Sequence, residues 1–241
     1  MRNPTLKSIA RAATLAISAS LGAAEALAAS TTEFTLKGGA LIELVFLQDG
    51  DAGLLPEFET AIETAGGDYL VGFDVVKNLA KDHSATRVAM VQWSTAASRA
   101  AADAIYADLG TVLNDTGFFV VQADTAVALD HDKIYDFTSA WTIAKTPEEM
   151  GIVMQVIGHY FQKIGPIVDE YEIATRAFMM RHPAGAELAP AFTPQITGLF
   201  EWRSLQDHAR FQNDPRWLEH VDIRNAVLAR KEDILLMQVA D

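Results

Sequence analysis

Residues 201–217 read EWRSLQDHARFQNDPRW, and residues 92–109 read QWSTAASRAAADAIYADL. In each stretch a strand-like segment ends in a Trp and passes into a polar helix. An apolar segment ending in Ala-Asp closes each copy, first at residues 118–124 and then at residues 234–241. The sequence therefore predicts the same structural unit twice, and this repetition decides the fold.

The elements around these stretches follow the same order in both halves. Periodicity and Gly or Pro breaks predict first-half strands at residues 40–47, 69–76, 86–93 and 118–123, with helices at 55–64 and 96–109. Second-half strands are predicted at residues 134–144, 173–180, 196–202 and 234–239, with helices at 147–164 and 205–231. Both halves read β-α-β-β-α-β, the ferredoxin-like unit. One such unit leaves a sheet face uncovered, and two copies can cover each other.

The second stretch also carries a resemblance to a known family. The matching residues are Glu201-Trp202, Ser204-Leu205, Ala209-Arg210-Phe211, Asp214-Pro215 and Trp217. On these residues the chain resembles the dimeric α/β-barrel superfamily, and most closely a small bacterial branch of unknown function. The resemblance implies an α+β fold in which two ferredoxin-like units form an intramolecular dimeric α/β barrel. The first half keeps only the outline, because Gln92 replaces the Glu and the Asp-Pro-aromatic step is missing.

The first 28 residues differ in composition from the rest. Three cations precede an apolar run at residues 12–24, and Ala26-Leu27-Ala28 offers the small-x-small pattern of a cleavage site. We expect a signal peptide and a periplasmic or secreted protein. No later stretch has the roughly 18 to 20 apolar residues that a membrane span needs. The predicted division is a signal peptide at 1–28, a degenerate first ferredoxin-like unit at 29–130 and a second unit at 131–241.

Charge and cysteine content exclude several classes of function. The formal net charge is -13, and removal of residues 1–28, with three cations and one anion, takes it to about -15. Such a surface repels phosphate, so no nucleic-acid partner is expected. The chain has no cysteine, which excludes disulfides and thiolate chemistry.

Glu201 and Trp202 are the first candidate site residues. They point to opposite faces because neighbouring strand residues alternate. An inward Glu201 would be a buried carboxylate and a general acid/base candidate, or it would form a structural ion pair with Arg176 or Arg181. Trp202 and its counterpart Trp93 would either wall a cavity or fill the core.

Histidines supply the remaining chemistry. His182 opens a loop of about a dozen residues, which is longer than most connections, and is a second catalytic candidate. His159 and His182 are the candidates for a haem ligand, but neither has a supporting motif. His208 is expected on a solvated polar face beside Asp207. No metal site and no cofactor are predicted.

Three functions fit the sequence. The main prediction is an exported protein whose barrel binds a small, largely apolar molecule, lined by Trp141, Phe178, Met180, Phe200 and Trp202. The second is an enzyme, for which the resemblance implies cofactor-independent monooxygenases, haem-using enzymes or isomerases. The third is a filled barrel that acts through its surface as an interaction or stress module. Any site is expected in the second half, where Trp202 and Phe178 would stack on the ligand, Arg181 and His182 would bind its polar or anionic group, and Glu201 would transfer a proton. Further oligomerisation is left open by the sequence.

Overall fold

The computed structural model describes residues 31–48, 54–80, 84–189 and 191–239. The expected signal peptide lies outside the described residues. Within them, two ferredoxin-like units follow one another. The elements of the first unit are β2 (Leu41–Leu47), α2 (Leu54–Thr64), β3 (Asp68–Asn78), β4 (Arg87–Trp93), α3 (Ala96–Ala100), α4 (Asp103–Leu109) and β5 (Leu113–Val120).

The second unit repeats this order with a longer first helix. Its elements are β7 (Ile134–Thr142), α5 (Pro147–Glu170), β8 (Ala174–Arg181), α6 (Gly185–Leu188), β9 (Ile196–Trp202), α7 (Leu205–Gln212), α8 (Pro215–Leu218), α9 (Val221–Asn225) and β10 (Leu228–Gln238). Helix α5 begins as its sequence predicts, since Thr146 caps it, Pro147 occupies its first turn and Glu149 returns the hydrogen bond of a capping box.

The eight principal strands form a closed barrel in the order β10-β3-β4-β2-β5-β8-β9-β7, and β10 pairs with β7 to close it. The fourth strand of each unit pairs with the second strand of the other, β5 with β8 and β10 with β3. The β5–β8 seam is short, with two residue pairs, Phe119 with Arg181 and Val120 with Met180. This topology confirms the predicted tandem α/β barrel.

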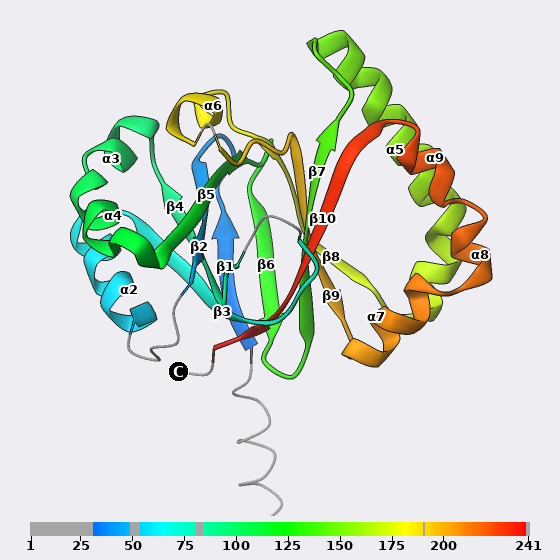
Figure 1. Ribbon diagram of the computed structural model, residues 1–241, viewed down its shortest axis with the longest axis horizontal. Coiled ribbons are helices and arrows are strands. Elements are labelled where there is room, and N and C mark those ends of the chain that lie inside the picture. Colours follow the sequence, from blue (N-terminus) through cyan, green and yellow to red (C-terminus); the bar gives the residue numbers. More distant parts are fainter. Residues whose placement is uncertain (1–30, 49–53, 81–83, 190, 240–241) are drawn as a thin grey trace, which may run out of the picture.

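The barrel interior is packed with large apolar side chains. Inward-facing residues of both sheets form one cluster that includes Phe46, Phe73, Phe119, Phe137 and Met179, each no more than 1 % exposed. Helices α2, α3 and α4 cover the outer face of the first sheet, and α5, α7, α8 and α9 cover the second (Figure 1). The space predicted inside the barrel is therefore taken by side chains, and a ligand site has to be sought between a sheet and its helices.

Several local elements differ from the sequence prediction. Strands β1 (Thr31–Leu36) and β6 (Thr125–Asp130) were not predicted; they pair with each other and add apolar side chains to the barrel core. The predicted helix at 205–231 is three short helices, and its last residues already belong to β10. No helix among the described residues is long and apolar enough to cross a membrane.

Candidate functional site

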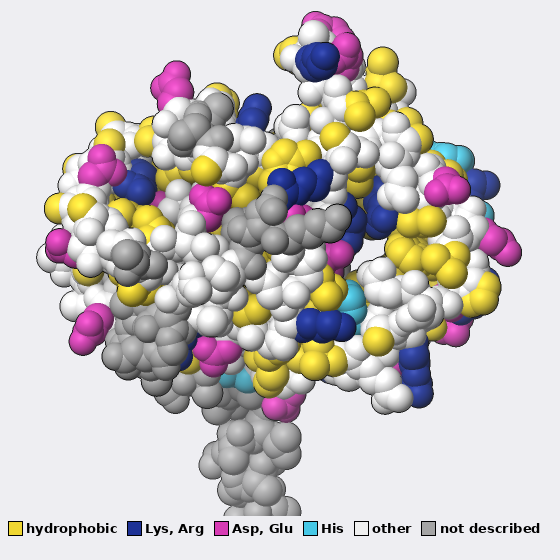
Figure 2. Space-filling model, viewed as in Figure 1, with side chains coloured by type: hydrophobic (Ala, Val, Ile, Leu, Met, Phe, Trp, Pro, Cys, Tyr) yellow, Lys and Arg dark blue, Asp and Glu magenta, His cyan; other side chains and the backbone are white. Residues whose placement is uncertain are grey.

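A groove lies between α5 and the outer face of the second sheet. Figure 2 shows the corresponding hollow between the barrel and the helices of the second unit. Its deepest part is a cavity of about 120 Å³ with mainly aromatic and aliphatic walls: Tyr160, Phe161, Ile164, Val168, Ile173, Phe200, Trp202, Phe211 and Trp217. Two further hollows of about 50 and 270 Å³ share Phe161 and Phe200 with it and therefore adjoin it. We call these three hollows the α5 groove.

The aromatic walls are held by specific contacts. The indole Nε1 of Trp217 donates a hydrogen bond of 2.7 Å to the hydroxyl of Tyr160, which fixes α8 against α5. Phe200 lies on the floor beside Gly198. A Cβ at residue 198 would lie 2.5 Å from the Phe200 ring and clash with it, so the glycine is needed for the ring to adopt this position. The groove is thus a preformed apolar slot, the usual shape of a small-molecule site.

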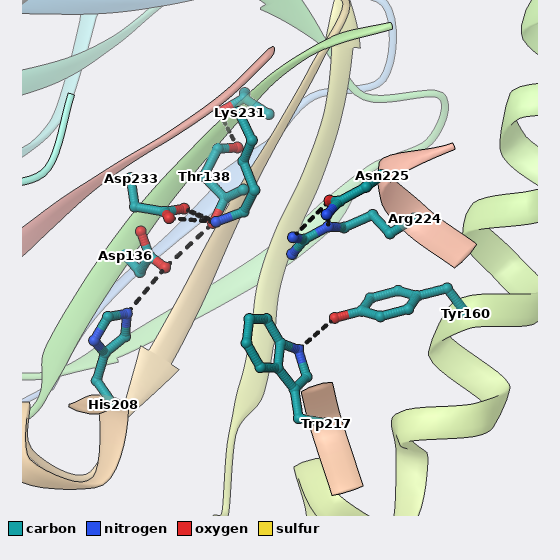
Figure 3. A network of polar contacts seen from close by, with 10 residues as sticks. Asp136, Thr138, Tyr160, His208, Trp217, Arg224, Asn225, Lys231 and Asp233 are labelled. Carbon is teal, nitrogen blue, oxygen red and sulfur yellow. Dashed lines mark hydrogen bonds and ion pairs between the residues drawn. The ribbon is translucent and has the colours of Figure 1, made fainter. Parts of the chain in front are cut away.

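Asp136 on β7 provides a buried carboxyl at the sheet side of the cavity. It is 3 % exposed, and its Oδ2 lies 3.2 Å from the hydroxyl of Thr138. The same hydroxyl lies 2.9 Å from Oδ1 of Asp233, which is also paired with Lys231 (Figure 3). A hydroxyl has one proton to donate. If Thr138 donates it to the charged Asp233, a protonated Asp136 can donate to Thr138 in turn.

The surroundings of Asp136 favour that protonated form. Burial raises its pKa well above the ordinary value, the negative charge of Asp233 adds to the rise, and Lys231 and Thr138 oppose it. Its second oxygen, Oδ1, is buried and has no hydrogen-bond partner among the described residues. A buried carboxyl group with a raised pKa is a candidate for taking up and releasing a proton in catalysis.

His208 and Trp202 bring two more unpaired polar atoms to Asp136. The His208 Nε2 atom lies 3.9 Å from Asp136 Oδ2, too far for a hydrogen bond, and the His208 and Trp202 rings meet edge to face at 4.7 Å between centroids. Neither His208 Nε2 nor Trp202 Nε1 has a partner among the described residues. Burial lowers the pKa of His208, so the ring is neutral. Three unpaired buried polar atoms on touching residues are costly unless a ligand or water satisfies them.

The first half shows the same arrangement in closed form. Glu43 occupies on β2 the place of Asp136 on β7, and Arg99 follows Trp93 at the same distance as His208 follows Trp202. Glu43 accepts hydrogen bonds from Trp93 Nε1 at 2.8 Å, from Arg99 Nε at 3.0 Å and from the Tyr106 hydroxyl at 2.6 Å. An aspartate is one methylene shorter than a glutamate, and histidine is shorter than arginine. The second half therefore keeps the polar positions but leaves them unconnected.

Three of the predicted ligand-binding residues line the α5 groove. Trp202 and Phe200 face the deepest cavity, and Phe178 faces the two adjoining hollows. Trp141 lies on the barrel side instead, where it packs against Phe192 at 5.5 Å and under the guanidinium of Arg230 at 4.4 Å. The prediction of aromatic residues in the second half thus leads to a groove outside the barrel.

The predicted polar residues lie elsewhere. Glu201 points to the barrel side and forms a two-pronged ion pair with Arg176, at 2.8 Å from both Nε and Nη2, so it takes the structural alternative. Arg181 and His182 lie at the β5–β8 seam, where the His182 amide donates to the Phe118 carbonyl. His182 Nδ1 accepts from the amide of Ala184. None of these residues lines the α5 groove.

Six polar residues that line the groove or adjoin it were not predicted from the sequence: Asp136, Thr138, His208, Arg224, Lys231 and Asp233. His208 was expected on a solvated face, but it is 3 % exposed because the first turn of α7 packs it under Trp202. A signal was available in β7, where polar Asp136 and Thr138 alternate with apolar residues. Two polar residues on one face of an otherwise apolar strand indicate that this face is not simply core.

The comparisons with known proteins bear on the fold. No protein-family model and no curated protein matches the sequence. Among solved structures, an anthrone oxidase-like protein is similar over 86 % of this chain and 94 % of its own, with 14 % identity and a TM-score of 0.58. A chlorite dismutase variant from Candidatus Nitrospira defluvii is similar over 85 % of this chain and 93 % of its own, with 10 % identity and a TM-score of 0.54. These neighbours are dimeric α/β-barrel proteins, so the chain has that fold.

Haem-using enzymes belong to the classes that the resemblance implies, but the groove does not fit haem. No histidine lines it among the described residues, His159 is exposed on α5, and His182 lies at the β5–β8 seam. The deepest cavity is close in size to one of about 150 Å³ that holds benzene. This volume can hold one aromatic ring, and the adjoining hollows offer room for further rings.

Proposed function

We propose that the protein is a cofactor-independent, monooxygenase-like enzyme that acts on a planar aromatic molecule in the α5 groove. The observation that carries this proposal is the buried Asp136 beside an aromatic slot, with the unpaired polar atoms of His208 and Trp202 next to it. The solved structures of similar fold support it, since one of them is an anthrone oxidase-like protein.

Each polar residue has a role in the proposed reaction. In its ionised form Asp136 removes a proton from an acidic carbon–hydrogen bond of the substrate. Thr138 holds the carboxyl in place, and neutral His208 beside it can pass the proton on. The Trp202 indole N–H can donate to a substrate oxygen that becomes negative as the proton leaves. Dioxygen is the co-reactant that accepts the electrons of the resulting carbanion.

The unpaired, buried carboxyl of Asp136 favours an enzymatic role over a purely binding role. A binding protein would be more stable with the closed arrangement of Glu43 and Arg99, whereas an unpaired carboxyl with a raised pKa is an advantage in proton transfer. A role limited to the surface is disfavoured because the groove is open although the barrel is filled.

Anthrone is a suitable first probe because it is a planar tricyclic ketone with an acidic carbon–hydrogen bond. The reaction to follow is anthrone plus dioxygen giving anthraquinone plus water, measured as oxygen uptake and product formation. Exchange of the acidic hydrogens with deuterated water reports the proton step separately. Asp136→Asn should lower both rates by about 10²- to 10⁴-fold.

Asp132→Asn, at an exposed position in the turn before β7, is the matched control and should keep the wild-type rates. Equal rates in the Asp136→Asn variant and the wild type would contradict the assignment of the base. If the wild type produced neither oxygen uptake nor hydrogen exchange above buffer, the proposed chemistry would be wrong.

We also propose that the enzyme works outside the cytoplasm, on the basis of the signal-like composition of residues 1–28. The N-terminal sequence of the exported protein tests this point, since cleavage is expected after residue 28. A mature chain that still contained Arg2 to Arg11 would refute it.

A further inference from the structure

Arg224 is the cation that the proposed reaction does not use, and it lines both the deepest cavity and the hollow next to it. It extends from α9 toward the sheet (Figure 3). Its Nε and Nη2 atoms lie 3.2 and 3.0 Å from the side-chain oxygen of Asn225. The guanidinium carbon lies 5.6 Å from the ring centre of Tyr160 and 5.7 Å from that of Trp217. These contacts hold the guanidinium beside the aromatic walls.

No carboxylate of the described residues lies within ion-pair distance of Arg224. Arg176 of the same unit, which is also half-buried, is by contrast paired with Glu201. An arginine has five N–H donors in a planar fork, so Arg224 retains donors for a ligand after its bonds to Asn225.

Arg224 is the charged residue of the groove lining whose charge is not balanced by a neighbour. Three charged residues line the deepest cavity: Asp136, Lys231 and Arg224. Lys231 is neutralised by its ion pair with Asp233, and burial raises the pKa of Asp136, which favours its neutral form. With Asp136 in that form, the lining carries a net positive charge inside a protein whose formal charge is -13. Figure 2 shows basic side chains within the hollow, while acidic side chains are spread over the visible surface around it.

We propose that the α5 groove selects aromatic carboxylates, with the ring against Phe161 and Phe200 and the carboxylate on the guanidinium of Arg224. This inference rests on the proposed function and names its substrate class. A planar carboxylate matches the fork of an arginine in two parallel hydrogen bonds. The aromatic walls exclude water from that pair, which strengthens it. Arg224 is a specificity residue, since the proton transfer takes place at Asp136.

The test compares 2-naphthoate with 2-naphthamide, which has the same rings and nearly the same shape but no charge. Dissociation constants are measured by isothermal titration calorimetry on the full protein at low and high salt. The wild type should bind the acid at least about tenfold more tightly than the amide. Arg224→Gln should reduce this ratio to about one without weakening the amide. Lys163→Gln, at an exposed cation of α5, is the matched control and should keep the ratio.

The outcomes separate this inference from the proposed function. If the acid and the amide bind the wild type equally well, the carboxylate preference is refuted while the aromatic site stands. If Arg224→Gln keeps the preference for the acid, the assignment of that preference to Arg224 is refuted. If neither compound binds the wild type, the aromatic site itself fails, and the proposed function fails with it. Circular dichroism of Arg224→Gln should match the wild type, because Arg224 is only half-buried and has no ion pair to lose.

Discussion

Two buried carboxyls at equivalent positions should respond in opposite ways to conversion into an amide. Glu43 in the first half is fully buried and bound by Arg99, Trp93 and Tyr106, whereas Asp136 in the second half has one unpaired oxygen and no charged partner at hydrogen-bond distance. Glu43→Gln leaves the guanidinium of Arg99 buried without its carboxylate. Asp136→Asn replaces a carboxyl whose pKa is raised by burial, and the amide resembles its favoured neutral form.

The structure sets the size of both effects. Breaking a buried ion pair by removing one partner costs about 3 to 5 kcal/mol. For a chain of this length, 1 kcal/mol corresponds to about 2 to 4 °C in Tm, so Glu43→Gln should lower Tm by about 6 to 20 °C. Asp103, the other carboxylate on Arg99, is largely exposed and cannot replace Glu43. Asp136→Asn exchanges one hydrogen bond to Thr138 and removes the cost of burying a carboxyl with a raised pKa at neutral pH, so it should leave the free energy of unfolding unchanged or raise it.

Urea unfolding followed by tryptophan fluorescence measures both variants at neutral pH. The double variant Glu43→Gln/Arg99→Met is the control, because it removes the buried charge together with its partner and should recover part of the loss. Equal losses in the two single variants would refute the distinction between a closed first half and an open second half. A larger loss for Asp136→Asn would refute it more strongly, since Asp136 would then be a structural residue.

Three further predictions follow from individual contacts. The folded-state pKa of Asp136 is raised, so the wild type should lose stability relative to Asp136→Asn as pH rises. The loss should begin near the unfolded pKa of about 3.9 and end at the folded pKa. A difference in the free energy of unfolding that stays constant with pH in urea titrations would contradict this. Glu201→Gln should weaken the pair with Arg176 and lower stability by about 1 to 3 kcal/mol, yet leave 2-naphthoate binding unchanged by calorimetry; weaker binding would place Glu201 in the site after all. Trp217→Phe removes the hydrogen bond to Tyr160, so it should cost about 1 kcal/mol and loosen the groove, and an unchanged melting curve would show that this bond contributes nothing.

The fold could be predicted because its main signals are local and occur twice. Alternating apolar residues mark the barrel strands, and the Trp at the end of β4 and β9 marks where each sheet passes into its helices. The end of the chain was harder, because the charged run at Leu228 to Asp233 reads as a helix. In the structure this run is the start of β10, where Lys231 and Asp233 face the groove side and Arg230 and Glu232 lie on the other side beside Trp141.

The α5 groove lies in the half in which the sequence predicted a site, but the polar residues beside it are not the ones that the sequence singled out. The sequence says that Glu201 and Trp202 face opposite ways, but it does not say which face meets helices and which meets the barrel core. The structure places Trp202 toward the helices and Glu201 toward the barrel. Asp136 and His208 are 72 positions apart, and only the packing of α7 against β7 brings them together. The sequence does place Asp136 and His208 at the positions that Glu43 and Arg99 occupy in the first half. This correspondence indicates a polar site only when the structure shows that Glu43 and Arg99 are buried together.

A crystal structure with 6-bromo-2-naphthoate bound tests the central claim most directly, because the anomalous signal of bromine locates the ligand independently of the protein density. The ring is expected in the α5 groove against Phe200 and Trp202, with the carboxylate about 3 Å from the guanidinium of Arg224. Bromine in the first half, inside the barrel or at the loop after His182, with the α5 groove empty, would contradict the account.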